Sequence, residues 1–418
     1  PRNFSSNLKM QKVLFIGVNW PEPTTAAGTR IMQIIQILLN ANFDVTFCST
    51  AATSDYSYDL ESLNVAKVNI ELNNSSFDTF ISALQPNIVI FDRFLTEEQF
   101  GWRVTEQVPN ALRILDTEDL HSLRVVRGEL YKKNIPFTTE LWFQNDITKR
   151  EIASILRCDI ALIISSFEME FLNANIPVLE NLLFYLPFVV PPINQGVINV
   201  NPSFENRKDF ICIGNGKHAP NVDAFVWLKN EIWPLIYNKL PNAQLHIYGS
   251  YLPQQILEMH KPTEGFYVDG FTENLENTFT NARINLAPLR YGAGLKGKLL
   301  DAMCYGTPSI ATTIGVEGLT NGHSFNGCIA NSAEEFASKA VALYSDETSF
   351  IQFQKNGYYI LEQEFNADNW TLKLLETIST YQRNLVQNRQ RNFIGSLLQH
   401  QTMQSTKYMS KWIEAKNS

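Results

Sequence analysis

A glycine-rich turn followed by a short helix is the part of the sequence best suited to bind an anion. Gly292, Ala293 and Gly294 leave almost no side chains in the turn, so a ligand can approach the backbone closely. The apolar spacing from Leu295 onward predicts a helix that ends near Gly306. Free N–H groups and the positive end of the helix dipole point toward such a turn. We therefore expect an anionic ligand at this place.

Residues 285–319 resemble the signature of family 4 of the retaining glycosyltransferases, which have the GT-B fold. The match covers a strand, the glycine turn, a helix and a second strand in the family's order. The matching residues are Pro288, Gly292, Gly294, Lys298, Asp301, Ala302, Met303, Gly306, Pro308, Ala311 and Thr312. The resemblance implies a nucleotide-diphosphate sugar donor, with Asp301 on the ribose hydroxyls. It also implies that the backbone of residues 292–296 contacts the sugar and pyrophosphate.

Three positions lack side chains that the family uses on the donor. Ala293 stands where the family has a Glu, so one contact to the donor is missing. The first turn of the second domain, opened by Gly214, has Asn215 and Asn221 where many members have an Arg and a Lys on the phosphates. The phosphate charges must therefore be balanced by other cations. We expect Lys298 to be the main substitute, followed by Arg290, Lys296 and Arg30.

Lys298 also has a simpler interpretation. It lies three residues before Asp301, which is the spacing of an ion pair on a helix face. We favour the phosphate role, because a diphosphate leaving group gains negative charge and a fixed cation stabilises that transition state.

A second group of titratable residues follows a predicted strand near residue 115. Asp116, Asp119 and His121 could supply a carboxylate, an orienting group and a proton acceptor, and Arg124 and Arg127 follow at helical spacing. By resemblance, His121 contacts the transferred sugar, with Asp119 as its neighbour. The alternative is a helix N-cap made by Asp116 or Asp119 with surface Arg partners. The predicted catalytic residues are thus His121, Asp119 and Lys298.

Two further turns belong to the predicted site by resemblance. The loop 19–29 places Gly28 and Arg30 at a helix start, where with Asp116 they would form the loop that faces the donor phosphates and the acceptor. The alternative is a plain turn with a solvated Arg. Gly270 and Phe271 match the turn that holds the nucleobase, although an aromatic residue at a strand end is more often part of the core.

Buried strands alternate with helices along the whole chain, which predicts two doubly wound α/β sheets. The helices best marked by periodicity are 30–39 and 222–240. The strands of the first half are expected at 12–18, 43–49, 65–70, 87–91, 111–115 and 159–165. Those of the second half are expected at 210–213, 245–248, 266–268, 284–287 and 309–312.

The predicted architecture is GT-B, in which two Rossmann-like domains face each other across a cleft. We expect an acceptor domain over 10–190, a linker over 191–206 and a donor domain over 207–365. Residues 366–418 are expected to form C-terminal helices and a basic tail. The tail is predicted either to pack on the body as an amphipathic helix or to contact a polyanion such as RNA or an anionic lipid surface.

The overall composition excludes several classes of protein. A net charge of −8 on 418 residues gives no general basis for binding nucleic acid. No D-x-D pair or zinc spacing occurs, so we expect no metal and no cofactor besides the donor. Five scattered cysteines, no visible signal peptide and no spanning apolar segment favour a cytoplasmic protein, with peripheral membrane attachment as an extension of that expectation.

The function predicted from the sequence is a metal-independent, retaining transfer of a sugar from a nucleotide-diphosphate sugar. The acceptor could be a glycan, a lipid-linked sugar, a protein or RNA. One alternative is a nucleotide-sugar epimerase of the same fold. The other is a non-catalytic protein that binds a sugar nucleotide or serves as a partner subunit.

Overall fold

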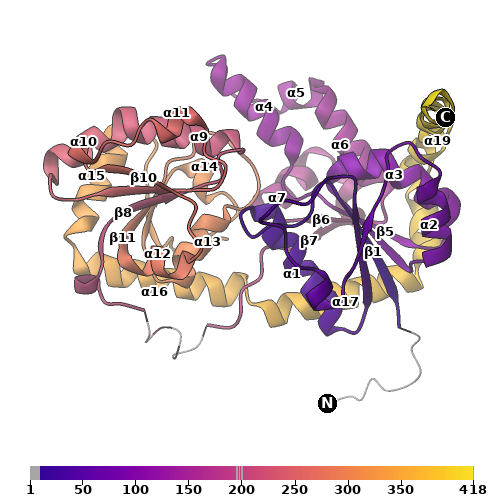
Figure 1. Ribbon diagram of the computed structural model, residues 1–418, viewed down its shortest axis with the longest axis horizontal. Coiled ribbons are helices and arrows are strands. Elements are labelled where there is room, and N and C mark those ends of the chain that lie inside the picture. The colour runs from indigo at the N-terminus through magenta and orange to yellow at the C-terminus, as the bar shows by residue number, and fades with distance from the viewer. Residues whose placement is uncertain (1–9, 194–195, 197, 199–200, 418) are drawn as a thin grey trace.

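The computed structural model describes residues 10–193, 196, 198 and 201–417, and it contains two domains side by side (Figure 1). Each domain is built on one parallel sheet with helices on both faces. The seven-stranded N-terminal sheet has the order β3-β2-β1-β4-β5-β6-β7, and the six-stranded C-terminal sheet has the order β10-β9-β8-β11-β12-β13. The two predicted doubly wound sheets are therefore present.

The N-terminal sheet consists of β1 (Lys12–Gly17), β2 (Asp44–Ser49), β3 (Ala66–Asn69), β4 (Ile88–Asp92), β5 (Leu112–Asp116), β6 (Ile160–Ile163) and β7 (Leu183–Tyr185). Its helices are α1 (Ala26–Asn40), α2 (Ser76–Leu84), α3 (Arg93–Gln107), α4 (His121–Lys132), α5 (Thr139–Gln144), α6 (Asp146–Arg157) and α7 (Ser166–Asn175).

The C-terminal sheet consists of β8 (Lys208–Ile213), β9 (Leu245–Tyr248), β10 (Phe266–Gly270), β11 (Ala282–Ala287), β12 (Ser309–Ala311) and β13 (Gly327–Ile329). Its helices are α9 (Ala219–Trp227), α10 (Trp233–Lys239), α11 (Gln254–Leu257), α12 (Leu275–Asn281), α13 (Gly297–Cys304), α14 (Thr313–Val316), α15 (Ala333–Tyr344) and α16 (Glu347–Glu364). Three last helices follow: α17 (Ala367–Arg383), α18 (Leu385–Arg391) and α19 (Phe393–Asn417). Short 3-10 turns lie at Glu61–Leu63, Pro177–Leu182, Phe204–Asn206 and Pro262–Glu264.

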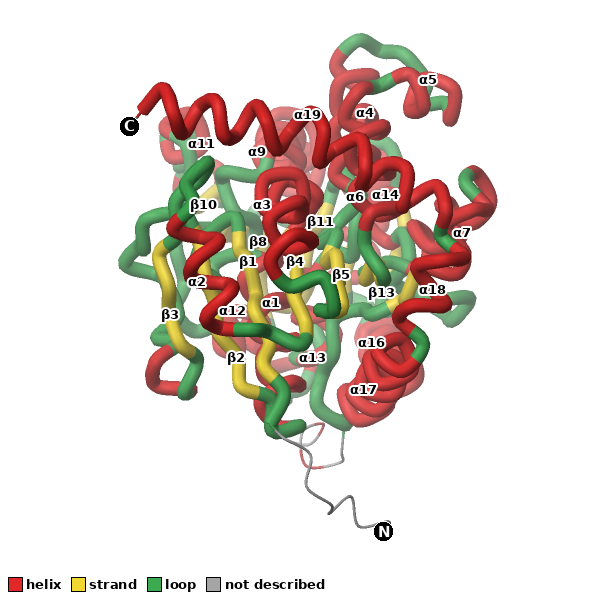
Figure 2. Tube along the Cα trace, turned by 90° about the vertical axis from the view of Figure 1, so that its right-hand side faces the viewer, coloured by secondary structure: helices red, strands yellow, loops and turns green. Residues whose placement is uncertain are grey.

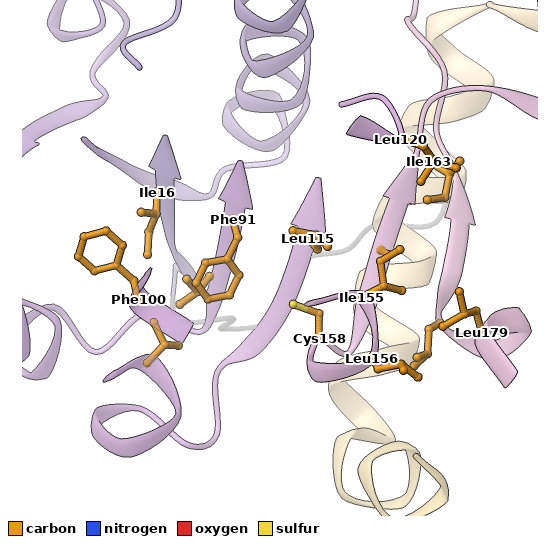
Figure 3. Packing of buried hydrophobic residues seen from close by; sticks show 14 of the residues in the cluster. Ile16, Phe91, Phe100, Leu115, Leu120, Ile155, Leu156, Cys158, Ile163 and Leu179 are labelled. Carbon is orange, nitrogen blue, oxygen red and sulfur yellow. The ribbon is translucent and has the colours of Figure 1, made fainter. Parts of the chain in front are cut away.

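Strand β1 shows why the N-terminal sheet is buried on both faces. Its residues alternate between two hydrophobic cores, because successive side chains of a strand point to opposite faces. Leu14 and Ile16 join the core under α3 and α6, part of which Figure 3 shows, whereas Val13 and Phe15 join the core under α1. The continuous apolar run of this strand therefore predicted a two-sided sheet correctly.

The two connections between the domains run side by side. The backbone of Val190 pairs with Phe365 and Ala367 through two 2.8 Å hydrogen bonds. Helix α16 lies under the C-terminal domain and α17 under the N-terminal domain, where Leu374 and Ile378 enter the core (Figure 1). The chain thus leaves the N-terminal domain and returns to it at one place. Part of the predicted linker, at 194–195, 197 and 199–200, lies outside the described residues.

Several predicted boundaries were wrong in detail. Helix α13 begins at Gly297, so Leu295 lies in the loop before it. The predicted helix 222–240 is divided by a π-helical turn at Leu228–Ile232, and Pro234 in the following helix lacks a backbone N–H. Strands β7 and β13 were missed, whereas β12, which also has three residues, was predicted from its place after Gly306 and Pro308 in the signature.

Candidate functional site

The carboxyl edge of the C-terminal sheet brings the N-termini of α9 and α13 together. Lys298, in the first turn of α13, donates from Nζ to Asn221 Oδ1 at 2.7 Å. Asn221, in the first turn of α9, donates in turn to the carbonyl of Asn215 at 3.1 Å. A Cβ at Gly214 would lie only 2.7 Å from the Asn221 side chain. Glycine at 214 therefore allows Asn221 to fit where it meets Lys298.

The predicted ion pair between Lys298 and Asp301 is not found among the described residues. Lys298 instead contacts a neutral amide, so its charge is not balanced by a carboxylate within hydrogen-bonding distance in the described chain. Burial lowers the pKa of Lys298. The N-termini of α9 and α13 also lie here, and the positive ends of their dipoles favour an anion.

The carboxylate of Asp301 has no hydrogen bond from any described residue, although it is partly buried. Burial alone raises its pKa to about 7. A carboxylate in this condition is stabilised by any ligand that donates hydrogen bonds to it. Ribose hydroxyls, which the family resemblance implies at this position, are donors of that kind.

The glycine loop between β11 and α13 lies directly against the N-terminal domain. Gly292 and Gly294 have positive φ values of 148° and 68°, conformations that favour glycine. A Cβ at Gly294 would lie 2.7 Å from the Cβ of Asp119. Lys296 donates from Nζ to the Gly294 carbonyl at 2.9 Å, and Ala293 packs on the edge of the N-terminal core. The loop therefore forms part of the domain interface.

Glu168 joins the glycine loop to the N-terminal domain, and the sequence did not identify it. Its Oε1 accepts hydrogen bonds from the backbone N–H of Gly294 at 2.7 Å and of Leu120 at 3.0 Å. The side chain is 1% exposed, and burial together with the Asp119 carboxylate raises its pKa. A signal existed, because Ser165 and Glu168 have the spacing of a helix capping box. In the structure Ser165 makes no side-chain cap, and Glu168 reaches across the interface instead.

A second link crosses the interface beside the first. Arg127 of α4 forms an ion pair with Glu317 through contacts of 2.6 and 3.0 Å, and it donates to the carbonyl of Gly292 at 3.0 Å. The sequence placed Arg127 on a helix face but gave no partner in the other domain. Both ends of the glycine loop are therefore fixed by N-terminal side chains in this closed arrangement.

Asp119 and His121 lie together at the start of α4, and Arg124 connects them. Arg124 donates from Nε to Asp119 Oδ2 and from Nη2 to His121 Nδ1, both at 2.6 Å. Burial and the Arg124 cation lower the pKa of His121 to about 4. The imidazole is therefore neutral near pH 7, and because its Nδ1 accepts from a guanidinium, its proton is on Nε2. This ring can donate a hydrogen bond to a substrate oxygen.

The predicted alternative, a helix cap by Asp116 or Asp119, is wrong. The carboxylate of Glu151 in α6 accepts from the backbone N–H of His121 and of Ser122, both at 2.9 Å. Glu151 thus satisfies the first N–H groups of α4 from another helix, and Asp119 is left to interact with Arg124.

Arg30 and Asp116 form a buried ion pair, with Arg30 Nε 2.8 Å from Asp116 Oδ1. They are 1% and 0% exposed, and Arg30 also donates to the Leu186 carbonyl at 2.7 Å. The solvated-Arg alternative is therefore wrong. Gly28 lies beneath the loop before α1, since a Cβ there would lie 2.0 Å from the carbonyl oxygen of Glu22. Its N–H donates to the Thr25 hydroxyl at 2.9 Å. These groups stabilise the first loop in this structure.

Arg290 and the turn at Gly270 and Phe271 both lie against side chains of the N-terminal domain. Arg290 pairs with Asp223 at 2.6 Å, lies between the rings of Tyr131 and Trp227, and lines a cavity of about 450 Å³ with them. Gly270 ends β10 with a φ of 78°, and its carbonyl accepts from the Gly249 N–H.

Phe271 is 40% exposed, so it is not a core residue. Its ring centroid lies 5.1 Å from that of Tyr56 in the N-terminal domain. Tyr56 also contacts the ring of Tyr251, whose hydroxyl donates to Glu22 at 3.1 Å. This aromatic group closes the far side of the interface.

Comparison with known proteins agrees with this description. Residues 207–346 match the family described as Glycosyl transferases group 1. An uncharacterized 44.6 kDa protein in the cps region of Klebsiella pneumoniae is 23% identical over 164 residues, which span 38% of this chain and 42% of that protein.

Solved structures resemble nearly the whole fold. Sucrose-phosphate synthase from Thermosynechococcus elongatus superimposes with a TM-score of 0.67 at 16% identity, covering 88% of this chain and 98% of that one. TarM of S. aureus, solved with UDP among its ligands, gives 0.66 at 10% identity, covering 88% and 99%. HepE of Anabaena, solved with UDP and glucose, gives 0.62 at 12% identity, covering 88% and 99%. The predicted GT-B fold is confirmed, and the match at 207–346 supports a group 1 glycosyltransferase.

Proposed function

We propose that this protein is a metal-independent, retaining glycosyltransferase that uses a nucleotide-diphosphate sugar and no other cofactor. The observation that carries the proposal is the environment of Lys298. It lies where two helix N-termini meet, and its described partner is a neutral amide. Arg30 and Arg290, by contrast, are already paired with Asp116 and Asp223. Lys298 is therefore the cation best able to balance a diphosphate.

Three further observations support this donor. Asp301 offers a partly buried carboxylate without a described donor, close to Lys298 in α13. The structures of TarM and HepE, which have the same fold, were solved with UDP. The retaining outcome rests on the resemblance of residues 285–319 to a retaining family, and the metal-free mechanism rests on a lysine taking the place of a metal charge.

In the proposed reaction the bond between the sugar C1 and the diphosphate oxygen breaks. The diphosphate keeps the bonding electrons, and Lys298 and the positive ends of the α9 and α13 dipoles stabilise its growing charge. An acceptor hydroxyl then bonds to C1, and its proton passes to the leaving phosphate. The neutral His121 donates from Nε2 to an oxygen of the transferred sugar, with Arg124 and Asp119 holding its ring.

Donor binding in this arrangement requires the domains to separate. The Gly294 N–H that would face the donor is bonded to Glu168. We expect the donor to replace Glu168 at this N–H and the domains to close again over it, which also excludes water from the sugar.

The test is thermal unfolding of the protein with UDP-, GDP-, ADP- and dTDP-sugars. One nucleotide should raise the melting temperature, because a ligand at 100 times its Kd stabilises by about 2.7 kcal/mol. Lys298→Ala should abolish the shift, and Lys239→Ala, an exposed lysine of α10, should keep it. The shift should persist in EDTA. If no nucleotide sugar stabilises the protein, the donor proposal is wrong.

His121→Ala separates an enzyme from a binding protein. We expect it to keep the thermal shift and to lose about 100-fold or more in turnover, as for a lost proton or hydrogen-bond donor at the reacting group. A wild-type protein that binds the donor but transfers no sugar to any acceptor would support the non-catalytic alternative.

A further inference from the structure

Helix α19 lies on the outside of the N-terminal domain, away from the cleft. It packs on α3 and α6, and Figure 2 shows it crossing the face that is turned toward the viewer. Its inner side is fixed by polar contacts: Arg103 donates to the Ser410 hydroxyl at 3.3 Å, and Glu414 accepts from the Ser75 N–H at 2.7 Å. The prediction that the tail packs on the body is thus confirmed, and its outer side needs a separate explanation.

The outer side of α19 carries large apolar side chains in two groups. Phe393, Ile394 and Leu397 lie near its start, and Tyr408, Met409 and Trp412 near its end, with exposed fractions from 45% to 66%. At about 100° per residue these six positions fall within one arc of roughly 160°, on the side opposite Ser410. Exposed Gln401, Gln404 and Ser405 separate the two groups, so this side of the helix carries two apolar patches in line. Exposed apolar side chains gathered in this way indicate a binding surface.

The exposed charges of the same segment are all positive. Between residues 383 and 417 they are Arg383, Arg391, Lys411 and Lys416. The acid of this segment, Glu414, is bonded to Ser75. Lys411 and Lys416 border the apolar arc on its two sides. The whole chain has a net charge of −8, so the positive charge of this face is opposite in sign to the net charge of the protein.

We propose that the outer face of α19 docks on the surface of an anionic lipid bilayer, with the helix axis parallel to the membrane. The apolar side chains enter the boundary between headgroups and acyl chains, where Tyr408 and Trp412 also keep their polar atoms hydrated. The lysines contact lipid phosphates. None of the described helices is long and apolar enough to cross a bilayer. The contact proposed for α19 is with the membrane surface.

Charge and chemistry favour lipid over the other partners. A second copy would bring the same positive face against itself, and like charges oppose that contact. A nucleic acid would contact the lysines through its phosphates, but it would leave Phe393, Ile394, Leu397 and Met409 without apolar partners. A bilayer satisfies both kinds of side chain. The proposal does not depend on the donor site.

The experiment is sedimentation of the full chain with vesicles of phosphatidylcholine alone or with about one third phosphatidylglycerol. We expect binding to the anionic vesicles that weakens with salt. Leu397→Ser combined with Tyr408→Ser and Trp412→Ser should reduce partitioning at least tenfold. Lys411→Glu with Lys416→Glu should reduce partitioning about tenfold or more, since each lysine near an anionic surface adds to the affinity for that surface.

Two matched variants control for net charge and surface hydrophobicity. Lys239→Glu with Lys355→Glu changes the same charge on the C-terminal domain, and Leu372→Ser with Tyr359→Ser removes comparably exposed apolar groups. Both should bind vesicles like the wild type, and all variants should retain the wild-type melting temperature within a few degrees.

Four results would overturn the proposal. One is absence of vesicle binding by the folded wild-type protein. Another is dimerisation, seen by sedimentation equilibrium without lipid, that the Leu397, Tyr408 and Trp412 substitutions abolish. The third is retention of vesicle binding by both groups of α19 variants. RNA binding lost in the lysine variants, with no effect of the apolar substitutions, would assign the face to nucleic acid instead.

Discussion

Both sheets place charged side chains at their carboxyl edges, but the partners of these side chains differ between the two domains. At the N-terminal edge, Arg30 is paired with Asp116 and Arg93 with Asp92, and both aspartates are fully buried. At the C-terminal edge, Lys298 contacts a neutral amide, and no described residue donates to the Asp301 carboxylate. The two arginines of the N-terminal edge are therefore paired with carboxylates, whereas Lys298 of the C-terminal edge is not.

This difference indicates where the protein is prepared for a ligand. A buried pair is satisfied without a ligand, and breaking it leaves a charge in a low-dielectric interior. A buried lysine without a carboxylate partner and a carboxylate without a hydrogen-bond donor lower the stability of the unliganded protein. A ligand that brings an anion to the lysine and hydroxyl groups to the carboxylate restores that stability. Glu118 is an exception at the N-terminal edge, because its buried Oε1 has no described hydrogen-bond partner, and burial and the Asp116 carboxylate raise its pKa.

The largest expected effect tests the structural role of the N-terminal edge. Asp116→Ala leaves the buried Arg30 without its carboxylate, and we expect a loss of about 3–5 kcal/mol in the free energy of unfolding. Urea denaturation measures this loss. Asp301→Ala, which removes an unpaired carboxylate, should cost less than about 1 kcal/mol. If Asp116→Ala and Asp301→Ala lower the free energy of unfolding equally, the paired and unpaired carboxylates do not differ as we describe.

A smaller effect concerns the pH dependence that Asp301 gives to stability. Its folded pKa is raised from 3.8 to about 7, so the folded state holds a proton that the unfolded chain releases. The resulting stability is present below pH 4 and is lost as the pH rises toward 7. Relative to Asp301→Asn, the wild type should lose up to about 2 kcal/mol over this range, allowing for solvent screening.

Urea denaturation at pH 4.5 and pH 8 would measure the Asp301 effect. Asp55→Asn, at an exposed position, is the control and should follow the wild type at both pH values. If the free energy of unfolding changes with pH in the same way for the wild type and for Asp301→Asn, the raised pKa of Asp301 is wrong.

The smallest expected effect concerns the pKa of His121, which lies at the N-terminal edge beside Arg124. Its pKa is lowered from 6.5 to about 4 by burial and by Arg124, so the stability it contributes is present above pH 6.5 and is lost as the pH falls toward 4. Arg124→Gln removes the cation and releases Asp119, so the pKa should rise by about one unit. NMR titration of the imidazole measures it, with Lys149→Gln as the control. An unchanged midpoint would assign the whole shift to burial.

The fold followed from the sequence because its signals are local. Uninterrupted apolar runs such as 12–18 and 87–91 marked the buried parallel strands, and their helices followed from periodicity. Lys298 and Asp301 could be selected because one helix carries both of them beside the glycine turn. Strands β7 and β13 were not found, since three residues carry no period and, unlike β12, neither lies within a recognised motif.

The rest of the site could not be predicted, because it depends on the relation between the domains. Glu168 and Arg127 contact a loop more than a hundred residues away, and neither partner is marked in the local sequence. The burial of Arg30 likewise depends on Asp116, at the end of β5, and on the carbonyl of Leu186, directly after β7, both far away in the sequence. A charged residue at a strand end is therefore visible in the sequence, but whether it is already paired is not.

The most direct test of the central claim is calorimetric titration of three proteins with the nucleoside diphosphate of the donor that stabilises the wild type. The proteins are the wild type, Lys298→Met and Arg290→Met. A charge-assisted hydrogen bond contributes about 1.5–3 kcal/mol, so Lys298→Met should weaken binding by roughly 10- to 100-fold. Arg290→Met should weaken binding by no more than about threefold, because Arg290 is already paired with Asp223. Unchanged affinity in Lys298→Met, or a larger loss in Arg290→Met, would contradict the assignment of the unbalanced C-terminal edge as the donor site.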